Sequence, residues 1–377
     1  MTIISYLTTI KFEHGAIQGL ADELKAVGIE RPLIVTDKGL AAAGILGTVR
    51  AGLPNSLPVA VYDATPANPT EMAVEDALEI YRAEGCDGLI ALGGGSSMDL
   101  AKAVGVLATH NGPLVSFAAI EGGVERITEA VAPVIAVPTT SGTGSEVGRG
   151  AMITFRDRRK MALLSPHLIP KRAICDPELT LGLPMGLTAA TGMDAFTHGV
   201  ETFLSPKINP PAEAIGLDGA TRAWTWIERA VADGSDRDAR WHMMMASTEG
   251  AMAFQKGLGA VHSMSHPLGG LEDMTLHHGT LNAVILPAVL RFNEGHVGDK
   301  YERMRDAFGL PADADLAAEV EALNARIGLP ANLREMGVTE EVIPAMVKGA
   351  LADHSTASNP RMPSAEDFQS LFEAAMG

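Results

Sequence analysis

The segment GLIALGGGSSMDLAKAVGVLA, residues 88–108, joins an apolar stretch, a glycine run and a helical pattern. The apolar stretch that ends at Gly93 predicts a buried strand, and Ser96 and Ser97 are suited to cap a helix that begins near Met98. Glycines let a backbone approach a ligand closely, and a helix N-terminus attracts anions through its free N–H groups and dipole. The segment therefore predicts a pyrophosphate-binding turn. A tight turn that merely requires glycine is the alternative, and the spacing departs from the GxGxxG fingerprint of a standard Rossmann unit.

Apolar runs on both sides of this segment extend the same pattern. The runs that predict strands are RPLIVTD (31–37), LPVAVYD (57–63), CDGLIALG (86–93) and APVIAVPTT (132–140), and the N-terminal MTIISYLTTIKFEHGA also has strand character. EMAVEDALEIYRAEG (71–85), which lies between two of them, has helical spacing. Continuous apolar strands that alternate with helices indicate a parallel sheet covered on both faces. Ligands of such sheets bind at the carboxyl ends of the strands.

Two of these strand ends carry polar residues that suit a dinucleotide. PTTSGTGSEV (138–147) offers hydroxyls and glycines that can line the phosphate or nicotinamide crevice. Asp37, in LIVTDKG, can accept hydrogen bonds from the ribose hydroxyls and would repel a 2′-phosphate, which favours NAD over NADP. A helix cap is the alternative role for a single aspartate at a strand end.

The second half of the chain has a helical pattern with few β-branched runs. The helical stretches are AATGMDAFTHGVETFL, NPPAEAIGLDGATRAWTWIERAVA, DARWHMMMASTEGAMAFQKGLGAV and the region from Ala317 to the end. The Pro- and Gly-rich DPELTLGLPMGL (176–187) is the predicted junction. We therefore expect an α/β domain over residues 1–183 and an all-helical domain over residues 184–377, in line with a length of 377 residues.

Charge and composition exclude several classes of protein. The formal net charge is −17 without a Lys/Arg-rich run, which argues against nucleic acid and anionic membranes as partners. No apolar stretch is long enough for a spanning helix, and the N-terminus lacks the features of a signal peptide. The two cysteines, Cys86 and Cys175, form no CxxC pair, so we expect a cytoplasmic protein without a disulfide framework.

Histidines concentrate in VHSMSHPLGGLEDMTLHHGT, residues 261–280. This stretch holds four of the chain's eleven histidines, namely His262, His266, His277 and His278. Upstream, Asp194 and His198 are four residues apart and so project from one face of a helix. A carboxylate with several imidazoles suits a divalent ion such as Fe²⁺ or Zn²⁺, and the ligand types do not distinguish the two. Single histidines satisfied in the core or at the surface are the alternative.

Four motifs in this order resemble those of the iron-containing (group III) alcohol dehydrogenases. They are GGGSSMDLAK, PTTSGTGSEV, MDAFTHGVE and GLGAVHSMSHPLGG…HHG, and with them the resemblance covers nearly the whole chain. The resemblance implies an α/β NAD-binding domain followed by an all-α domain, the dehydroquinate synthase-like fold, in a homodimer or larger homo-oligomer. It also implies that the metal ligands are Asp194, His198, His262 and His278. His277 stays open as the alternative to His278, because many members have Pro-His-Gly where this chain has His277-His278-Gly279.

The same resemblance implies the residues that bind NAD and the substrate. The implied cofactor residues are Asp37, Asn68, Gly94, Gly95, Ser96, Asp99, Thr139, Thr140, Thr143 and Lys160. His266 would either relay the hydroxyl proton or make a structural contact to the cofactor.

Four further segments look most like those of the 4-hydroxybutyrate dehydrogenases of the family. They are EVGRGA, NPPAEAIGLDG, AFQKGLGAVHS and LHHGTLNAVILPAVLRFN. This implies hydride transfer between 4-hydroxybutyrate and succinate semialdehyde. A carboxylated substrate needs a cation, for which Lys256 is the first candidate, followed by Arg149 and His277. The alternatives are a lactaldehyde, 1,3-propanediol or simple-aldehyde reductase of the same family, a dehydroquinate synthase-like lyase, and a non-catalytic nucleotide-binding protein.

Overall fold

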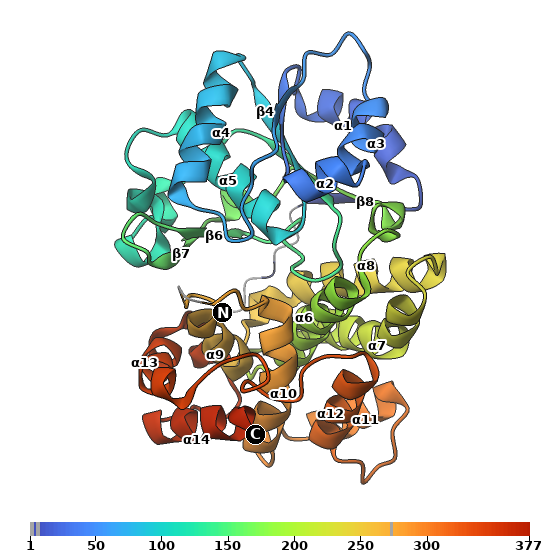
Figure 1. Ribbon diagram of the computed structural model, residues 1–377, viewed down its shortest axis with the longest axis vertical. Coiled ribbons are helices and arrows are strands. Elements are labelled where there is room, and N and C mark those ends of the chain that lie inside the picture. The colour runs from blue at the N-terminus through green and yellow to red at the C-terminus, as the bar shows by residue number, and fades with distance from the viewer. Residues whose placement is uncertain (1–3, 5–7, 272–273) are drawn as a thin grey trace. The chain divides into compact units, whose positions relative to one another are not determined.

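The computed structural model describes residue 4 and residues 8–271 and 274–377 (Figure 1). The chain divides into two compact units. Of the described residues, an α/β unit comprises residues 8–140 and Ser145–Gly182, and a helical unit comprises Ser141–Gly144 and Leu183–Gly377, apart from residues 272–273. Within these described ranges no helix is long and apolar enough to cross a membrane.

The α/β unit is built on a parallel sheet. In the described part of the chain the sheet has six strands in the order β1-β8-β5-β4-β2-β3, and all of its pairings are parallel. The strands are β1 (Thr9–Phe12), β2 (Pro32–Val35), β3 (Ala60–Tyr62), β4 (Gly88–Gly93), β5 (Val134–Pro138) and β8 (Arg172–Cys175). The predicted strands are thus confirmed. β8 and the antiparallel hairpin of β6 (Gly150–Thr154) and β7 (Lys160–Leu164) were not predicted from the sequence.

Alternate residues of the central strands enter two different hydrophobic clusters, because successive side chains of a strand point to opposite faces of the sheet. In β4, Leu89 and Ala91 join the cluster that includes residues of α4 (Glu71–Ala83) and α5 (Gly95–Thr109). Ile90 and Leu92 join the cluster that includes residues of α1 (Leu20–Val27) and α3 (Ile45–Ala51). Burial on both faces explains why this strand is apolar throughout.

The helix after β4 begins earlier than the sequence indicated. It starts at Gly95 with Gly94 as its N-cap, and no side chain caps it, so the predicted start near Met98 with serine caps is wrong. Instead of capping, the hydroxyl of Ser96 donates to the backbone oxygen of Ala67 at 2.5 Å. Gly93 has a φ of 149°, and a Cβ there would lie 2.8 Å from the Cβ of Ser97. Only glycine suits this turn, which lets the helix start directly after the strand.

The helical unit has α6 at its centre. Its helices are α6 (Met185–Leu204), α7 (Pro210–Ala232), α8 (Arg237–Met252), α9 (Ala260–Leu268), α10 (His278–Asn293), α11 (Lys300–Phe308), α12 (Leu316–Arg326), α13 (Ile343–Ala352) and α14 (Ala365–Met376). Helix α6 packs against α7, α8 and α10, and all but its first turn is buried. A short 3₁₀ turn (Ala253–Lys256) and Gly257, with a φ of 79°, separate α8 from α9. The expected fold class, an α/β domain followed by an all-helical one, is confirmed.

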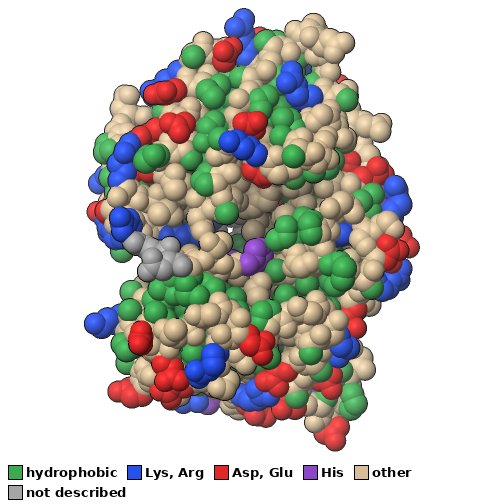
Figure 2. Space-filling model, in the orientation of Figure 1, with side chains coloured by type: hydrophobic (Ala, Val, Ile, Leu, Met, Phe, Trp, Pro, Cys, Tyr) green, Lys and Arg blue, Asp and Glu red, His purple; other side chains and the backbone are tan. Residues whose placement is uncertain are grey.

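The surface carries charges of both signs. On the face that Figure 2 shows in colour, acidic and basic side chains are interspersed, and no broad basic patch is present. This distribution agrees with the acidic net charge of −17. It gives no support for a nucleic-acid partner on this face.

Candidate metal centre and nucleotide site

Three helices of the helical unit bring the predicted metal ligands together. Helix α6 carries Asp194 and His198 one turn apart, α9 carries His262, and His278 is the first residue of α10. The Nε2 atoms of His198, His262 and His278 lie 3.4, 4.0 and 3.6 Å from Oδ1 of Asp194. One ligand atom from each of the four residues lies within 4.8 Å of all the others. This spacing allows a single ion to contact all four.

The charges of these side chains fit a cation. Burial alone would raise the pKa of Asp194. The imidazoles of His198 and His278 and the amide of Asn282 lower this pKa by more than burial raises it, so it lies below its usual value. Burial, together with the neighbouring His198, lowers the pKa of His262 well below its usual value. A buried carboxylate and three imidazoles therefore converge on one point, and oxygen and nitrogen ligands of these types are those that a divalent ion such as Fe²⁺ or Zn²⁺ takes.

The side chain of Asn282 also indicates that a polar ligand binds between the four candidate metal ligands. Its Nδ2 donates to Oδ1 of Asp194 at 2.8 Å and lies 3.3 Å from Nε2 of His262. Its Oδ1 is buried and has no hydrogen-bond partner among the residues that the structure describes. An unpaired buried oxygen is costly in a native protein. The four ligands and this amide therefore fit Fe²⁺ or Zn²⁺.

His266 and His277 lie beside this group without being part of it. The ring of His266 is stacked on that of His278 with centroids 5.5 Å apart, and its Nδ1 lies 2.8 Å from Oδ2 of Asp353. His277 is the N-cap residue of α10 and its side chain is exposed. Of the two adjacent histidines, the geometry thus groups His278, and not His277, with the other three candidate ligands.

Three residues near this group were not predicted from the sequence: Glu201 and Asn282, which contact candidate ligands, and Asp353, which contacts His266. Glu201 contacts Nδ1 of His262 at 2.6 Å, and burial raises the pKa of its carboxyl to about 7 although backbone N–H groups lower it. Its position three residues after His198, on the same face of a helix, could have indicated it. Asp353 could not be found this way, since it is 87 residues from His266.

The glycine turn of the α/β unit forms the candidate nucleotide site. The backbone N–H of Thr139 donates to the oxygen of Gly93 at 3.1 Å, so the ends of β4 and β5 lie side by side. A Cβ on Gly94 would lie 3.2 Å from Oγ1 of Thr140. The first turn of α5, with Gly95, follows directly and no side chain caps its N–H groups. This arrangement is suited to hold a pyrophosphate.

Asn68, Lys160 and Asp37, three of the other implied cofactor residues, are also in the α/β unit. Nζ of Lys160 donates to Oδ1 of Asn68 at 2.9 Å, which brings these two together. Asp37 lies after β2 and caps α2 (Lys38–Ala42) by accepting from the N–H of Leu40 at 3.0 Å, so the cap considered as its alternative role is present. A cap that uses Oδ1 does not prevent a second bond to a ribose.

Asp99 and Thr143 are held by other parts of the chain. Asp99 accepts from the hydroxyl of Ser145 and the N–H of Met152, both at 2.9 Å, and so binds the β6 hairpin and the segment before it. These bonds hold the segment after β5 and the hairpin to α5, and the contact of Asp99 with the cofactor stays a prediction. Thr143 belongs to Ser141–Gly144, which packs with the helical unit: a Cβ on Gly144 would lie 2.7 Å from the oxygen of Ser247.

Lys256, the first candidate for a substrate carboxylate, is held in a different cluster. Its ammonium is fully buried and binds Oε2 of Glu213 at 2.7 Å and the oxygen of Phe203 at 3.3 Å. Lys300 and Arg303 bind the same carboxylate. Although burial raises it, the bonds from Lys256 and Arg303 lower the pKa of Glu213 to about 2. Because its charge is already paired, this placement argues against Lys256 as the group that recognises substrate.

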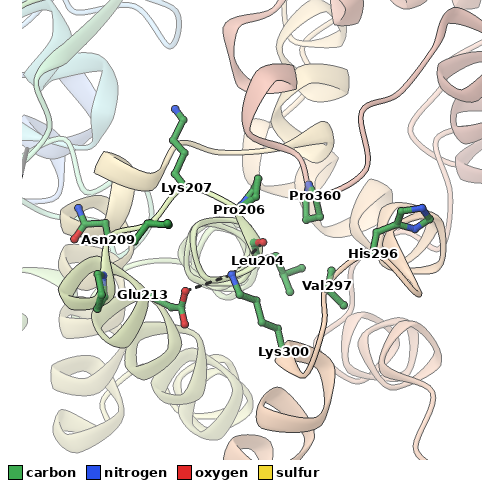
Figure 3. A pocket seen from close by; sticks show the side chains of 11 residues that line it. Leu204, Pro206, Lys207, Asn209, Glu213, His296, Val297, Lys300 and Pro360 are labelled. Carbon is green, nitrogen blue, oxygen red and sulfur yellow. Dashed lines mark hydrogen bonds and ion pairs between the residues drawn. The ribbon is translucent and has the colours of Figure 1, made fainter. Parts of the chain in front are cut away.

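A pocket of about 360 Å³ lies beside that cluster (Figure 3). Glu213 and Lys300 both line it and form an ion pair at 3.3 Å, and Lys300 also donates to the backbone oxygens of Phe203 and Ser205 at 2.7 and 3.0 Å. The lining residues include none of the four candidate metal ligands. Lys300 therefore caps the C-terminal end of α6, and the cluster has a structural role. The remaining candidate cations, Arg149 and His277, have exposed side chains.

A phosphate-binding turn on a parallel sheet and an aspartate–histidine metal group on helices are the two parts needed by a metal-dependent oxidoreductase with a nucleotide cofactor. Comparison with known proteins agrees with this class. The family model of the iron-containing alcohol dehydrogenases matches residues 8–177, and that of the family's C-terminal domain matches residues 188–376. The chain belongs to the iron-containing alcohol dehydrogenase family.

Individual relatives are similar over their full length. The chain is 56% identical over 383 residues to a 4-hydroxybutyrate dehydrogenase of Cupriavidus necator, and the match covers 100% of both. It is 39% identical to a 1,3-propanediol dehydrogenase of Citrobacter freundii, with 97% of this chain and 96% of that one covered. Among solved structures, sulfoacetaldehyde reductase of Bifidobacterium kashiwanohense in complex with NAD⁺ matches with a TM-score of 0.91 at 26% identity, over 100% of this chain and 99% of that one.

Proposed function

We propose that this protein is an NAD-dependent, metal-dependent alcohol dehydrogenase that interconverts 4-hydroxybutyrate and succinate semialdehyde. The observation that carries the substrate assignment is the 56% identity, over the full length, with the 4-hydroxybutyrate dehydrogenase of Cupriavidus necator. Identity with the 1,3-propanediol dehydrogenase of Citrobacter freundii is only 39%. A 1,3-propanediol dehydrogenase, a lactaldehyde reductase or a reductase of simple aldehydes is the second candidate, since relatives named for the first two activities match over 97% of this chain.

The residues described above have distinct roles in this reaction. Asp194, His198, His262 and His278 would hold Fe²⁺ or Zn²⁺, which when bound polarises the carbonyl or stabilises the alkoxide. His266, with Nδ1 fixed by Asp353 at 2.8 Å, has its Nε2 available to move the hydroxyl proton or to contact the cofactor.

The nucleotide side of the reaction rests on the glycine turn. The backbone at Gly94 and Gly95 would bind the pyrophosphate, and Asn68 and Lys160 would contact the nucleotide as a pair. Orientation of the nicotinamide toward the alcohol carbon is then the contribution of the protein, because the hydride chemistry belongs to the cofactor.

The proposal also covers the residue that binds the substrate carboxylate, the oligomeric state and the cellular compartment. With Lys256 committed to Glu213, Arg149 and His277 remain as candidate partners of the carboxylate. A homodimer or larger homo-oligomer follows from the family resemblance. Cys86 and Cys175 form no disulfide in the described chain, in keeping with the reducing cytoplasm.

Oxidation of NADH by Fe²⁺-reconstituted protein is expected to be faster with succinate semialdehyde than with butanal at matched concentrations. A charged hydrogen bond to the carboxylate should give a preference of about 10- to 100-fold in kcat/KM. Substitution of Arg149 or His277 by alanine should reduce this ratio for whichever residue binds the carboxylate. Lys256→Met is the control and should leave the ratio unchanged. Equal rates with the two aldehydes would leave the alcohol dehydrogenase standing and remove the 4-hydroxybutyrate assignment.

Replacement of Asp37 by serine is expected to relax the preference for NADH. Removal of the carboxylate removes its repulsion of a 2′-phosphate, so kcat/KM with NADPH should rise by about tenfold or more. Serine is also a good N-cap, so α2 should keep its cap and the melting temperature should change little. Steady-state kinetics with both cofactors provide the measurement. An unchanged NADPH activity would show that Asp37 serves the protein only as the helix cap.

A further inference from the structure

The buried carboxylate of Glu201 joins two parts of the metal centre. Glu201 lies on α6, three residues after His198, and is 4% exposed. Its Oε2 is 2.6 Å from Nδ1 of His262, and its Oε1 accepts from the backbone N–H of Val261 at 2.7 Å. One side chain thus binds both the ring of a candidate ligand and the first turn of the helix that carries it.

The start of α9 is shaped to receive this carboxylate. Gly259, the N-cap residue, has no side chain with which to cap the helix. A Cβ at this position would lie 2.8 Å from Oε1 of Glu201 and 2.9 Å from Oδ1 of Asn359. Asn359 in turn accepts from the N–H of Ala260 at 3.1 Å. Glycine here lets two side chains from elsewhere cap α9, and a negative charge at a helix N-terminus is favourable.

Nδ1 of His262 has a carboxylate partner in Glu201 and differs in this from Nδ1 of His198, a candidate ligand on α6. Nδ1 of His198 is buried and finds no hydrogen-bond partner in the described ranges of the chain, whereas Nδ1 of His262 faces a carboxylate. An acceptor on Nδ1 keeps the proton on that nitrogen and leaves the lone pair on Nε2. Nε2 of His262 is the atom that faces Asp194.

We propose that Glu201 is a positioning residue that holds the Nδ1 proton of His262 and thereby directs Nε2 of that ring to the metal ion. Glu201 contacts no substrate and ligates no metal itself. It acts through His262, and the inference rests on the metal site of the proposed function. The residue adds a carboxylate–histidine–metal relay to the site, a type of arrangement that raises the affinity of a ligand set.

The test is the metal affinity of Glu201→Gln, measured on metal-stripped protein by competition for Zn²⁺ with a chromophoric chelator. Glutamine has the same shape but one acceptor in place of two. If the glutamine oxygen accepts from the N–H of Val261, its amide nitrogen donates to Nδ1 of His262 and forces the ring proton onto Nε2. In the reverse orientation the amide nitrogen faces the N–H of Val261, and two donors oppose each other. We expect affinity to fall by about 10- to 100-fold. The absorption spectrum of the Co²⁺-loaded variant should change as well.

Asn359→Ala is the matched control, because it removes the other cap of α9 without touching His262. It should lower the melting temperature and leave Zn²⁺ affinity as in the wild type. An equal loss of affinity in both variants would show that Glu201 acts only as a helix cap and would overturn the proposal. Unchanged affinity in Glu201→Gln would overturn it too. Failure of the wild type to bind Zn²⁺ would instead remove the metal site itself.

A second measurement needs no variant and so remains decisive if Glu201→Gln does not fold. Nitrogen-15 NMR of Zn²⁺-loaded wild-type protein with labelled histidine reports which ring nitrogen carries the proton. We expect His262 to be protonated at Nδ1, with its proton shifted strongly downfield by the short bond to Glu201. A His262 with its proton on Nε2, or with the metal on Nδ1, would overturn the proposal.

Discussion

Asp194→Asn is expected to lower kcat/KM for the aldehyde by about 1000-fold or more, the loss that follows when several kcal/mol of transition-state stabilisation by a metal is removed. Asp194 is the only anion of the four candidate ligands, and the Nε2 atoms of the three histidines lie 3.4 to 4.0 Å from its Oδ1. Asparagine keeps the shape but gives up the charge that offsets the ion. Metal content after purification and steady-state NADH oxidation are the two readouts.

The loss must be separated from unfolding and from a general effect of charge. The melting temperature of metal-stripped Asp194→Asn should stay near that of the stripped wild type, since the replacement fits the same space. Asp218→Asn is the control: Asp218 lies on α7 and binds Arg222 at 2.8 Å, and its removal should leave activity intact. A chelated wild type should recover activity when Fe²⁺ is added back. Recovery of the Asp194→Asn variant to the same level would show that Asp194 is no ligand.

The parts of the fold that the sequence predicted are those with long, regular patterns. β4 is apolar at each position because both faces are covered, and α4 has a clear apolar stripe, so both were recognised. β6, β7 and β8 were missed for physical reasons. β6 and β7 form a two-stranded hairpin outside the main sheet, in which only alternate residues are buried. In β8 only Ala173, Ile174 and Cys175 are apolar, and they follow two charged residues, so no apolar run stands out.

The start of α5 was misplaced because serine is a better N-cap than glycine, and propensity therefore favoured Ser96 and Ser97. The decisive factor is the backbone at Gly93, whose positive φ no propensity scale reads from a sequence. In the same way, Gly257 interrupts what had looked like one helical run, at the point where the chain must turn from α8 into α9.

The candidate site shows the same limit. A pair such as Asp194 and His198, four residues apart on a helix, shares a face by local geometry alone, so spacing was sufficient to group them. Lys256 precedes His262 by six residues, but Gly257 and the 3₁₀ turn direct its side chain to Glu213 on α7, 43 positions away in sequence. Asp353, which holds His266, comes from a different part of the chain. Such contacts depend on tertiary packing and leave no local pattern.

Gly279→Ala is expected to destabilise the helical unit by about 3 kcal/mol, the upper end of the usual cost of overpacking. A Cβ at this position in α10 would lie 2.0 Å from the backbone oxygen of Ala190 and 3.1 Å from Cβ of Asp194. Backbone atoms of α6 cannot rotate away as a side chain can, so α10 must move. His278 is the adjacent residue, and any such movement takes its ring away from Asp194, 3.6 Å distant at present.

Gly279→Ala should therefore lose Zn²⁺ affinity as well as stability, and the two losses can be measured by urea unfolding and by chelator competition. Gly186→Ala is the matched control, because Gly186 lies on α6 and a Cβ there meets no atom of the described chain within 4 Å. That substitution should be neutral or stabilise by up to about 1 kcal/mol, since alanine favours the helix. If both variants were equally stable and bound Zn²⁺ equally well, close packing of α10 on α6 would not be what holds His278 in the ligand set.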